Sequence, residues 1–393
     1  MILITLLAVA MPAAAQRPPR VVPDRGDALV GTLPRGYSSL GPVAADAKSV
    51  GKSAGTISGS SVNSGDSADL TRIGRLLEAA SMTGDTRLVA RADALLARQP
   101  NAAGNPNLLR LRAYSAQHKH DFSGAIRLLD ALIELDPRNT DARLSRAEIQ
   151  LVQGRIDKAR ADCRSLVLGV DADTGLLCAA SLALRTGEYA TAASLLDRML
   201  GDLRPADLNR SFALLARAEV ASRAGEADAD ADARYQLALS ASPGDIRTRV
   251  SYARHLRRVG RNAEVEKVLA GSEQSDTAQL QRTLAAVAAK RPDAPKLVAA
   301  QARRYALAHA LGSEPEMRDE AEFLLISERR AREALALALR NFEEQRDFED
   351  VDILVRAADA AGDADALDGL HAWQKLQGLM QPETAGTKGG SKP

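Results

Sequence analysis

The sequence has few aromatic residues, almost no net charge and few long apolar runs. Aromatic residues make up 3% of its 393 residues, whereas hydrophobic residues make up 45%. A buried core must therefore be built from Ala, Leu and Val, which is the composition of close-packed helices. The 52 basic and 51 acidic residues leave a net charge of +1, which argues against a nucleic-acid or anionic-membrane partner held by bulk charge. Charges interrupt every later apolar run, so we expect no integral membrane segment in the mature chain.

Cysteine occurs only twice, at Cys163 and Cys178. In an exported protein such a pair can form a disulfide. Both cysteines also occupy apolar positions of the helical pattern described below, where Cys often serves as a small buried residue. Because disulfide geometry is demanding, the sequence favours two buried thiols and leaves the disulfide open.

Motifs that would hold a phosphate or a metal are incomplete. The stretch GKS at residues 51–53 lacks the earlier glycine of a phosphate loop, because Asp46 stands in its place. Residues 228–234 place acids two apart, as in a calcium loop. Ala233 and Leu239 replace the glycine and the glutamate that such a loop requires. We expect a solvated turn there.

Candidate catalytic groups are also scarce. His118 and His120 flank a turn and have no further ligands in view, so we expect exposed histidines rather than a metal site. The acids of residues 341–350 are expected to line a solvated helix face. The sequence therefore indicates no catalytic, cofactor-binding or metal-binding residues, and we expect that the protein is not an enzyme.

The first residues have the pattern of a signal peptide. An apolar run over residues 2–11 leads to three alanines that end at Ala15, a small-residue cleavage pattern. The run is about half the roughly 20 residues that a membrane-spanning helix needs. No Lys or Arg precedes it, and Gln16 stands where a lipoprotein would carry Cys. We expect a signal peptide over residues 1–15 and an exported protein, periplasmic or secreted.

Two low-complexity segments flank a helical region. Residues 16–67 are rich in Pro, Gly and Ser and show no helical or strand period, so we expect a disordered linker. Residues 380–393 have the same character and predict a disordered tail. Between them the helical periodicity is nearly continuous.

Within the helical region a small-and-apolar pattern recurs about every 34 residues. Its turns, spaced by 34, 33, 38 and 35 residues, fall at His120, Gly154, Gly187, Gly225 and Gly260. Seven residues before each turn stands an alanine: Ala113, Ala147, Ala180, Ala218 and Ala253. Another alanine follows each of the first four turns: Ala125, Ala159, Ala192 and Ala231. Small residues let antiparallel helices cross closely, and glycine takes the left-handed conformation that ends a helix. One such pair cannot bury its apolar face alone, so neighbouring pairs must stack.

The pattern resembles the tetratricopeptide repeat. Besides the interval, the resemblance is carried by A-x3-Y-x2-A-x4-P at Ala231, Tyr235, Ala238 and Pro243, although aliphatic residues mostly replace the family's Trp and Tyr in the first helix. It implies an all-α fold, a right-handed superhelical solenoid of antiparallel helix pairs. We expect the repeat array over residues 68–271, and divergent helical repeats with a capping helix over residues 272–379.

The resemblance also implies a function. In this family the concave groove is lined mainly by the first helix of each unit and binds an extended peptide or a partner helix. The matching positions here are Asn107, Arg110, Tyr114, Gln117, Glu148, Ser181, Glu219, Arg247, Arg254 and Arg257. We expect a non-enzymatic exported scaffold that binds a protein or extended peptide of the cell envelope, with no cofactor and no nucleic acid. The alternative is a structural component of a polysaccharide export or envelope-assembly complex. The sequence identifies neither the partner nor the oligomeric state.

Overall fold

The computed structural model describes residues 64–99, 104–202, 208–312 and 315–379, and over these residues it contains helices and no strand. They all belong to one compact unit, Val62–Pro393. The expected signal peptide, nearly all of the expected linker and the expected tail lie outside the described residues. Helix α1 begins at Ser64, slightly before the start that we expected for the array.

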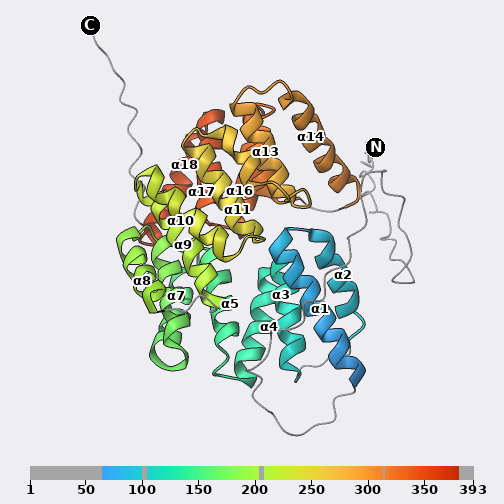
Figure 1. Cartoon of the computed structure of the whole chain (residues 1–393), viewed down its shortest axis with the longest axis vertical. Helices are drawn as coiled ribbons and strands as arrows, with labels where there is room; N and C mark the ends of the chain where they lie inside the picture. The colour runs from blue at the N-terminus through green and yellow to red at the C-terminus, as the bar shows by residue number, and fades with distance from the viewer. Residues whose placement is uncertain (1–63, 100–103, 203–207, 313–314, 380–393) are drawn as a thin grey trace, which may run out of the picture. The chain divides into compact units, whose positions relative to one another are not determined.

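The helices follow one another as antiparallel pairs (Figure 1). The pairs of the N-terminal half are α1 (Ser64–Thr83) with α2 (Thr86–Leu96), α3 (Pro106–His118) with α4 (Phe122–Leu135), α5 (Thr140–Val152) with α6 (Ile156–Ser165), and α7 (Ala172–Arg185) with α8 (Tyr189–Asp202). The later pairs are α9 (Leu208–Ala224) with α10 (Asp228–Ala241), α11 (Ile246–Arg258) with the short η2 (Asn262–Glu264) and α12 (Val265–Val268), α13 (Asp276–Ala288) with α14 (Ala294–Ala310), α15 (Met317–Ile326) with α16 (Ala331–Glu344), and α17 (Phe348–Ala361) with α18 (Ala364–Leu376). A π-helical turn, η1 (Leu166–Val170), follows α6. The predicted all-α solenoid of helix pairs is confirmed.

Short polar residues begin many of these helices. Their side chains accept a hydrogen bond from a backbone N–H of the first turn, at Asp85, Asn105, Asp121, Asn139, Asp171, Asp245, Ser275 and Asp363. Such caps satisfy amides that have no partner within the helix. The five predicted turn residues all have positive φ, from 59° at His120 to 80° at Gly187 and Gly260. The left-handed turn predicted for each unit is confirmed, including the unit that uses histidine.

The alanines of the repeat lie at the helix crossings. The five that precede the turns are at most 2% exposed, and the four that follow the turns are fully buried. The apolar residues four and seven positions further on are also buried: Leu129, Leu132, Cys163, Leu166, Leu196, Met199, Tyr235 and Ala238. The predicted small-and-apolar pattern therefore forms the core between helices.

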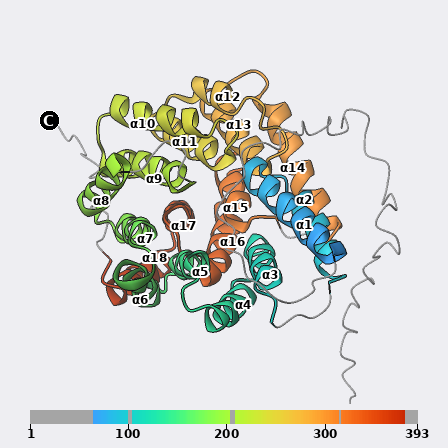
Figure 2. The ribbon, with the colours of Figure 1, turned by 60° about the horizontal axis from the view of Figure 1, so that its bottom comes forward.

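The stack continues beyond Gly271, which the sequence left open. Helix α13 packs against α11 and α12, α15 packs against α13, and α17 packs against α15. The first pair also contacts the later part of the array, because α1 packs against α11 and the Arg87 Nη2 donates a hydrogen bond of 2.6 Å to the Gln274 Oε1. In Figure 2 the preceding helices curve around α15, α16 and α17, which occupy the concave side.

The solvated turn expected at residues 228–234 is wrong. These residues form the first two turns of α10, in which Asp228 and Asp230 are exposed. Acidic side chains in a first turn favour the positive end of the helix dipole. The Asp232 side chain faces inward and pairs with Arg261, which follows α11 in the next unit. Local helix preference therefore outweighs the turn-like spacing of the acids.

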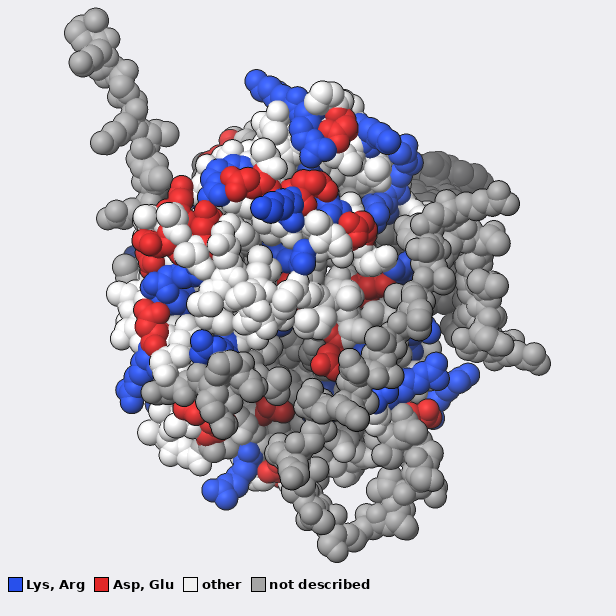
Figure 3. All heavy atoms as spheres, in the orientation of Figure 1, with Lys and Arg blue, Asp and Glu red and all other residues white. Residues whose placement is uncertain are grey.

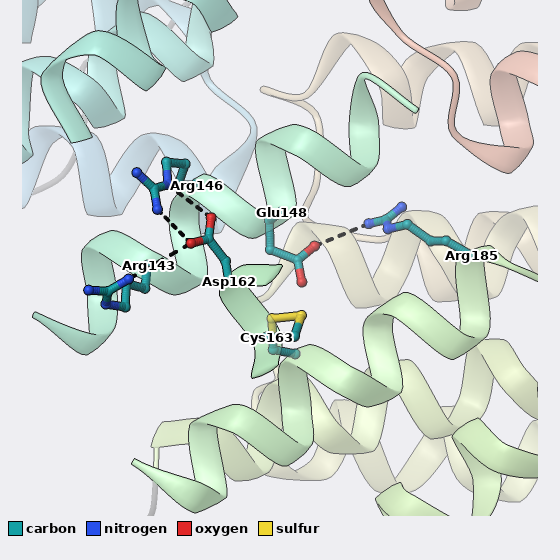
Figure 4. Close-up of a disulfide and its surroundings, with 7 residues drawn as sticks. Arg143, Arg146, Glu148, Asp162, Cys163 and Arg185 are labelled. Atoms are coloured by element: carbon teal, nitrogen blue, oxygen red, sulfur yellow. Dashed lines mark hydrogen bonds and ion pairs between the residues drawn. A yellow bond between two sulfur atoms is a disulfide. The ribbon is translucent and has the colours of Figure 1, made fainter. Parts of the chain in front are cut away.

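Cys163 on α6 and Cys178 on α7 form a disulfide (Figure 4), with their Cα atoms 5.2 Å apart. The favoured interpretation of two free thiols is wrong, although the burial predicted for both residues is confirmed. The bond joins the second helix of one unit to the first helix of the next. The repeat interval therefore brings the two side chains to facing positions.

Enlarging an alanine at a crossing should destabilise the fold. Ala180→Leu adds three carbons where the side chain is fully buried, and overpacking of this kind costs about 1–3 kcal/mol. Urea unfolding followed by circular dichroism measures the change. The control Ala306→Leu, at an exposed position of α14, should stay within about 0.5 kcal/mol of the parent. An unchanged midpoint for Ala180→Leu would show that the crossing tolerates a larger side chain.

The disulfide should contribute to stability. It closes a loop over a sequence separation of 15, which corresponds to about 3 kcal/mol in the chain-entropy account. Protein denatured without reductant should titrate no free thiol, and reductant should lower the unfolding midpoint. A Cys163→Ala/Cys178→Ala variant should show no response to reductant. Two free thiols in the unreduced protein would contradict the bond.

Candidate functional site

The residues predicted to line the groove lie on the first helices of successive units: Asn107, Arg110, Tyr114 and Gln117 on α3, Glu148 on α5, Ser181 on α7, Glu219 on α9, and Arg247, Arg254 and Arg257 on α11. Asn107 and Arg110 are exposed. The Tyr114 ring packs edge-on against His118 at 4.7 Å between centroids. The Arg247 guanidinium pairs with Asp245 and lies 4.6 Å from the Phe212 ring centroid. The other charged members belong to a network on the concave side.

On the concave side, arginines of α11 contact acids of the C-terminal helices. The Arg257 Nη2 lies 3.1 Å from the Glu322 Oε1, and the Arg254 Nη2 lies 3.5 Å from the Asp319 Oδ1. Asp319 also accepts a hydrogen bond of 2.7 Å from the Thr277 hydroxyl. Arg254 and Arg257 therefore pair with acidic residues of helix α15 in the same chain.

Two further arginines bind the start of α17. The Arg185 Nη1 lies 2.6 Å from the Asp347 Oδ1, and the Arg223 Nη2 lies 2.7 Å from the Glu349 Oε1. Between these pairs is the Phe348 ring, whose centroid lies 3.5 Å from the Arg223 guanidinium carbon. A guanidinium over an aromatic face adds cation–π attraction to the ion pair. Figure 4 shows Arg185 reaching Glu148 of α5 as well, at 3.4 Å, so this arginine joins three elements.

Residues at the turns of the first repeats also contact the part of the chain that contains α15 to α17. The His120 Nε2 lies 3.0 Å from the Glu316 Oε2, just before α15. The Arg346 backbone N–H donates a hydrogen bond of 2.6 Å to the Val152 carbonyl at the end of α5. Helices α15 and α17 are thus bound along the concave surface by residues from α3 to α11. We name these contacts the concave seam.

The carboxyl groups in and beside the concave seam differ in their protonation state. Burial alone would raise the pKa of Glu322, but Arg257 and Arg356 outweigh it and hold the pKa at about 2. Arginines likewise hold the pKa of Glu349 at about 2 against its burial. By contrast, burial and the neighbouring Glu349 raise the pKa of Glu219 to about 7. Glu322 and Glu349 are therefore ionised at neutral pH, whereas Glu219 is only partly ionised.

The solvated face expected for residues 341–350 is wrong over its second half. Asp350 is 1% exposed, and its carboxylate accepts hydrogen bonds from the Asn341 side chain and the Asp347 backbone N–H, each 2.8 Å long. This is one half of a capping box that begins α17. Glu343 and Glu344 remain exposed on α16. Asp347 and Glu349 are half-buried because α17 begins on the concave side.

A serine, a histidine and an aspartate also meet, which sequence spacing did not reveal. The Ser222 Oγ lies 2.8 Å from the His255 Nδ1, and the His255 Nε2 lies 3.7 Å from the Asp232 Oδ1. Burial lowers the pKa of His255. In a catalytic triad the acid orients the base through a hydrogen bond, and 3.7 Å is too long for one. The arrangement fits a packed polar cluster.

Two further findings concern ligands and membranes. Within the described ranges, no three His, Cys, Asp or Glu residues are grouped so that they could hold a metal ion. The exposure expected for both turn histidines is confirmed for His120 but is wrong for His118, which is half-buried at the end of α3. No described helix has the length and apolar character to cross a membrane.

One segment of the chain matches a known family of repeats. The family model for the tetratricopeptide repeat matches residues 116–166, from the end of α3 to the start of η1. A tetratricopeptide repeat protein from Parabacteroides merdae is 17% identical over 64% of this chain and 98% of that chain, with a TM-score of 0.39. The APC/C hetero-tetramer Cut9–Hcn1 is 16% identical over 79% of this chain and 64% of that chain, with a TM-score of 0.46. No curated protein matches the sequence. The chain is an α-solenoid with a tetratricopeptide match, a fold that suggests a protein-interaction scaffold.

The stability of the protein should be greatest in mildly acidic solution. The pKa of Glu219 in the folded protein is raised to about 7. The stability that this residue contributes is therefore lost as the pH rises from about 4.5 to above 7. Glu322 and Glu349, with pKa values of about 2, lose their ion pairs as the pH falls below about 4.5. Thermal unfolding midpoints across this range test the expectation.

A variant of Glu219 and a control variant separate the loss of stability at higher pH from the loss at low pH. Glu219→Gln should reduce the loss between about pH 5 and pH 8, and raise stability at the upper end by about 1–2 kcal/mol. Glu343→Gln, on the exposed face of α16, should leave the profile unchanged. The assignment to Glu219 fails if Glu219→Gln loses as much stability over that interval as the parent.

Proposed function

We propose that this protein is an exported, non-enzymatic scaffold that binds another protein of the cell envelope through its concave side. The observation that carries the proposal is the concave seam, in which arginines of the repeats hold acids of helical segments. Asp319 and Glu322 of α15 and Glu349 of α17 are all bound in this way. A surface that binds such helices within its own chain has the charge and shape to bind an acidic helix of a partner.

The packing supports exchange of the bound segment. One apolar cluster joins α13 to α18 and includes Leu284, Phe323 and Leu354. Separate clusters hold the earlier pairs, such as the one that contains Leu196 and Val220. The ion pairs of the concave seam make many of the contacts between the chain from α15 onward and the earlier pairs, beside apolar contacts of Phe348 and Leu379. Polar contacts between parts of a chain resemble transient interfaces, so a partner that offers acids and an apolar side chain in place of Phe348 can replace them.

Two features support export. The pattern of residues 1–15 is that of a signal peptide cut after Ala15. The bond between Cys163 and Cys178 is of a kind that persists in oxidising compartments such as the periplasm. The proposed mature chain begins at Gln16 and is periplasmic or secreted.

Affinity capture from the protein's own cell envelope, with crosslinking and mass spectrometry, tests the proposal. Asp319→Asn/Glu322→Gln/Glu349→Gln removes three acids of the concave seam and keeps its arginines, so capture of the partner should increase severalfold. Arg254→Glu/Arg257→Glu reverses the recognising charges and should abolish capture. The control Glu343→Gln/Glu344→Gln changes exposed acids of α16 and should capture as the parent does.

Crosslinks between one enriched protein and helices α7 to α11 would support the proposal. Equal capture by the parent and by Arg254→Glu/Arg257→Glu would show that another surface binds the partner. Enrichment of secretion-machinery components, crosslinked outside the repeats, would favour the alternative role in polysaccharide export or envelope assembly.

A further inference from the structure

A cavity of about 340 Å³ lies between α9, α11, α15 and α17. Six arginines line it: Arg223, Arg254, Arg257, Arg258, Arg318 and Arg356. Only three carboxylates do so, those of Glu322, Glu349 and Asp352. Six positive charges against three negative charges leave the lining with a formal charge of +3. On the face shown in Figure 3, by contrast, basic and acidic side chains are interspersed.

The cavity has a buried end and an open end. The side chains of Arg257 and Glu322 are 13% and 15% exposed, whereas those of Asp352 and Arg356 are 63% and 37% exposed. A molecule can therefore enter past Asp352 and Arg356. Ligand pockets in proteins begin at about 300 Å³, so the cavity has the size for a small organic molecule.

The carboxylates of the lining are already bound to particular arginines. Glu349 pairs with Arg223 at 2.7 Å. Glu322 pairs with Arg257 at 3.1 Å and with Arg356 at 3.4 Å. Asp352 pairs with Arg356 at 3.1 Å. None of these three acids forms an ion pair with Arg258.

Arg258 is the arginine that these acids leave uncompensated. It donates hydrogen bonds to the Ser222 hydroxyl at 2.6 Å and to the Ser222 carbonyl at 3.4 Å, and it forms no ion pair with a carboxylate of the described residues. Burial and the nearby Arg223 lower its pKa. The positive charge of Arg258 is thus electrostatically unfavourable in this position. An anion bound in the cavity would make it favourable.

Two other guanidinium donors around the cavity make no hydrogen bond. The Nε atom of Arg257 is buried and has no hydrogen-bond partner among the described residues. The Nε atom of Arg318 is also buried, and it lies 3.6 Å from the Asp319 Oδ1, too far for a hydrogen bond. The contact of Arg254 with Asp319, at 3.5 Å, is a long one. Buried donors without a partner are rare and costly in native proteins, so these groups point to a bound acceptor.

We propose that this cavity binds a small organic molecule that carries a phosphate group. Guanidinium groups pair with phosphate oxygens through two parallel hydrogen bonds. Arginines reach the cavity from three helices besides α17, so they approach from several directions. A tetrahedral phosphate offers oxygens in several directions, whereas a carboxylate offers two in one plane. The charge of a phosphomonoester at neutral pH, about −2, offsets most of the +3 of the lining.

The site shares Arg254 and Arg257 with the surface proposed to bind the partner, so its occupant would affect partner binding, but its test needs no partner. Its arginines come from α9 and α11 of the repeats and from α15 and α17 of the C-terminal segment. A phosphate bound between them would link the two parts and hold α15 and α17 on the concave side.

Calorimetric titration of the full chain with pyrophosphate, at constant ionic strength, tests the site. We expect saturable binding of one molecule per chain and a raised thermal unfolding midpoint. Arg258→Gln should weaken binding by about tenfold or more. Without pyrophosphate, the same variant should unfold no earlier than the parent, because the charge it removes is unfavourable. Arg304→Gln on α14, outside the cavity, should bind as the parent does.

The same titrations can overturn the proposal. Absence of saturable binding would exclude a phosphate site. So would a response to sodium sulfate or sodium chloride, at matched ionic strength, that equals the response to pyrophosphate. Equal binding by the parent and Arg258→Gln would place any site elsewhere. If Arg258→Gln does not fold, Arg356→Gln at the cavity mouth serves in its place, with the same expected loss. A lower midpoint of the unliganded Arg258→Gln protein together with unchanged affinity would show a structural role only.

Discussion

The close crossing of paired helices at buried alanines is the constraint on which the rest of the structure depends. Ala147, Ala180 and Ala218 are fully buried where the helices of their units meet. Because alanine lets helix axes approach closely, each pair is thin and presents its first helix to the concave side. Side chains from different units then share one space, which is how Arg185 of α7 and Arg223 of α9 both reach the start of α17.

Two kinds of contact have different roles in this arrangement. Apolar clusters join each helix to its partner and to the next pair, whereas ion pairs make many of the contacts of α15 and the start of α17 with α7 to α11. A buried ion pair adds little net stability, but loss of one partner leaves an uncompensated charge. The concave seam therefore specifies which helices lie there more than it strengthens the fold. The Phe348 ring under the Arg223 guanidinium adds a contact of fixed geometry.

The repeating features could be predicted from the sequence because their causes are local. An alanine seven residues before a left-handed turn recurs at an interval that periodicity alone reveals, and the fold follows from it. The concave seam could not be predicted in this way. Asp347 lies 162 residues from Arg185, and the acids bound by Arg254 and Arg257 lie 65 residues away from them. Charge alternation around Asp350 is typical of solvated helices, so nothing local marked that residue as buried. The disulfide needed facing side chains, which spacing alone does not establish.

The contact between the first pair and the middle of the array has a consequence for how the chain unfolds. An open repeat array is nearly one-dimensional, since each unit contacts only its neighbours and the terminal units fray independently. Here α1 packs against α11, and α17 contacts residues of α7 and α9. Loss of either end therefore breaks contacts far along the chain as well as one neighbouring interface. The helices should melt together as a single cooperative unit rather than peel from the termini.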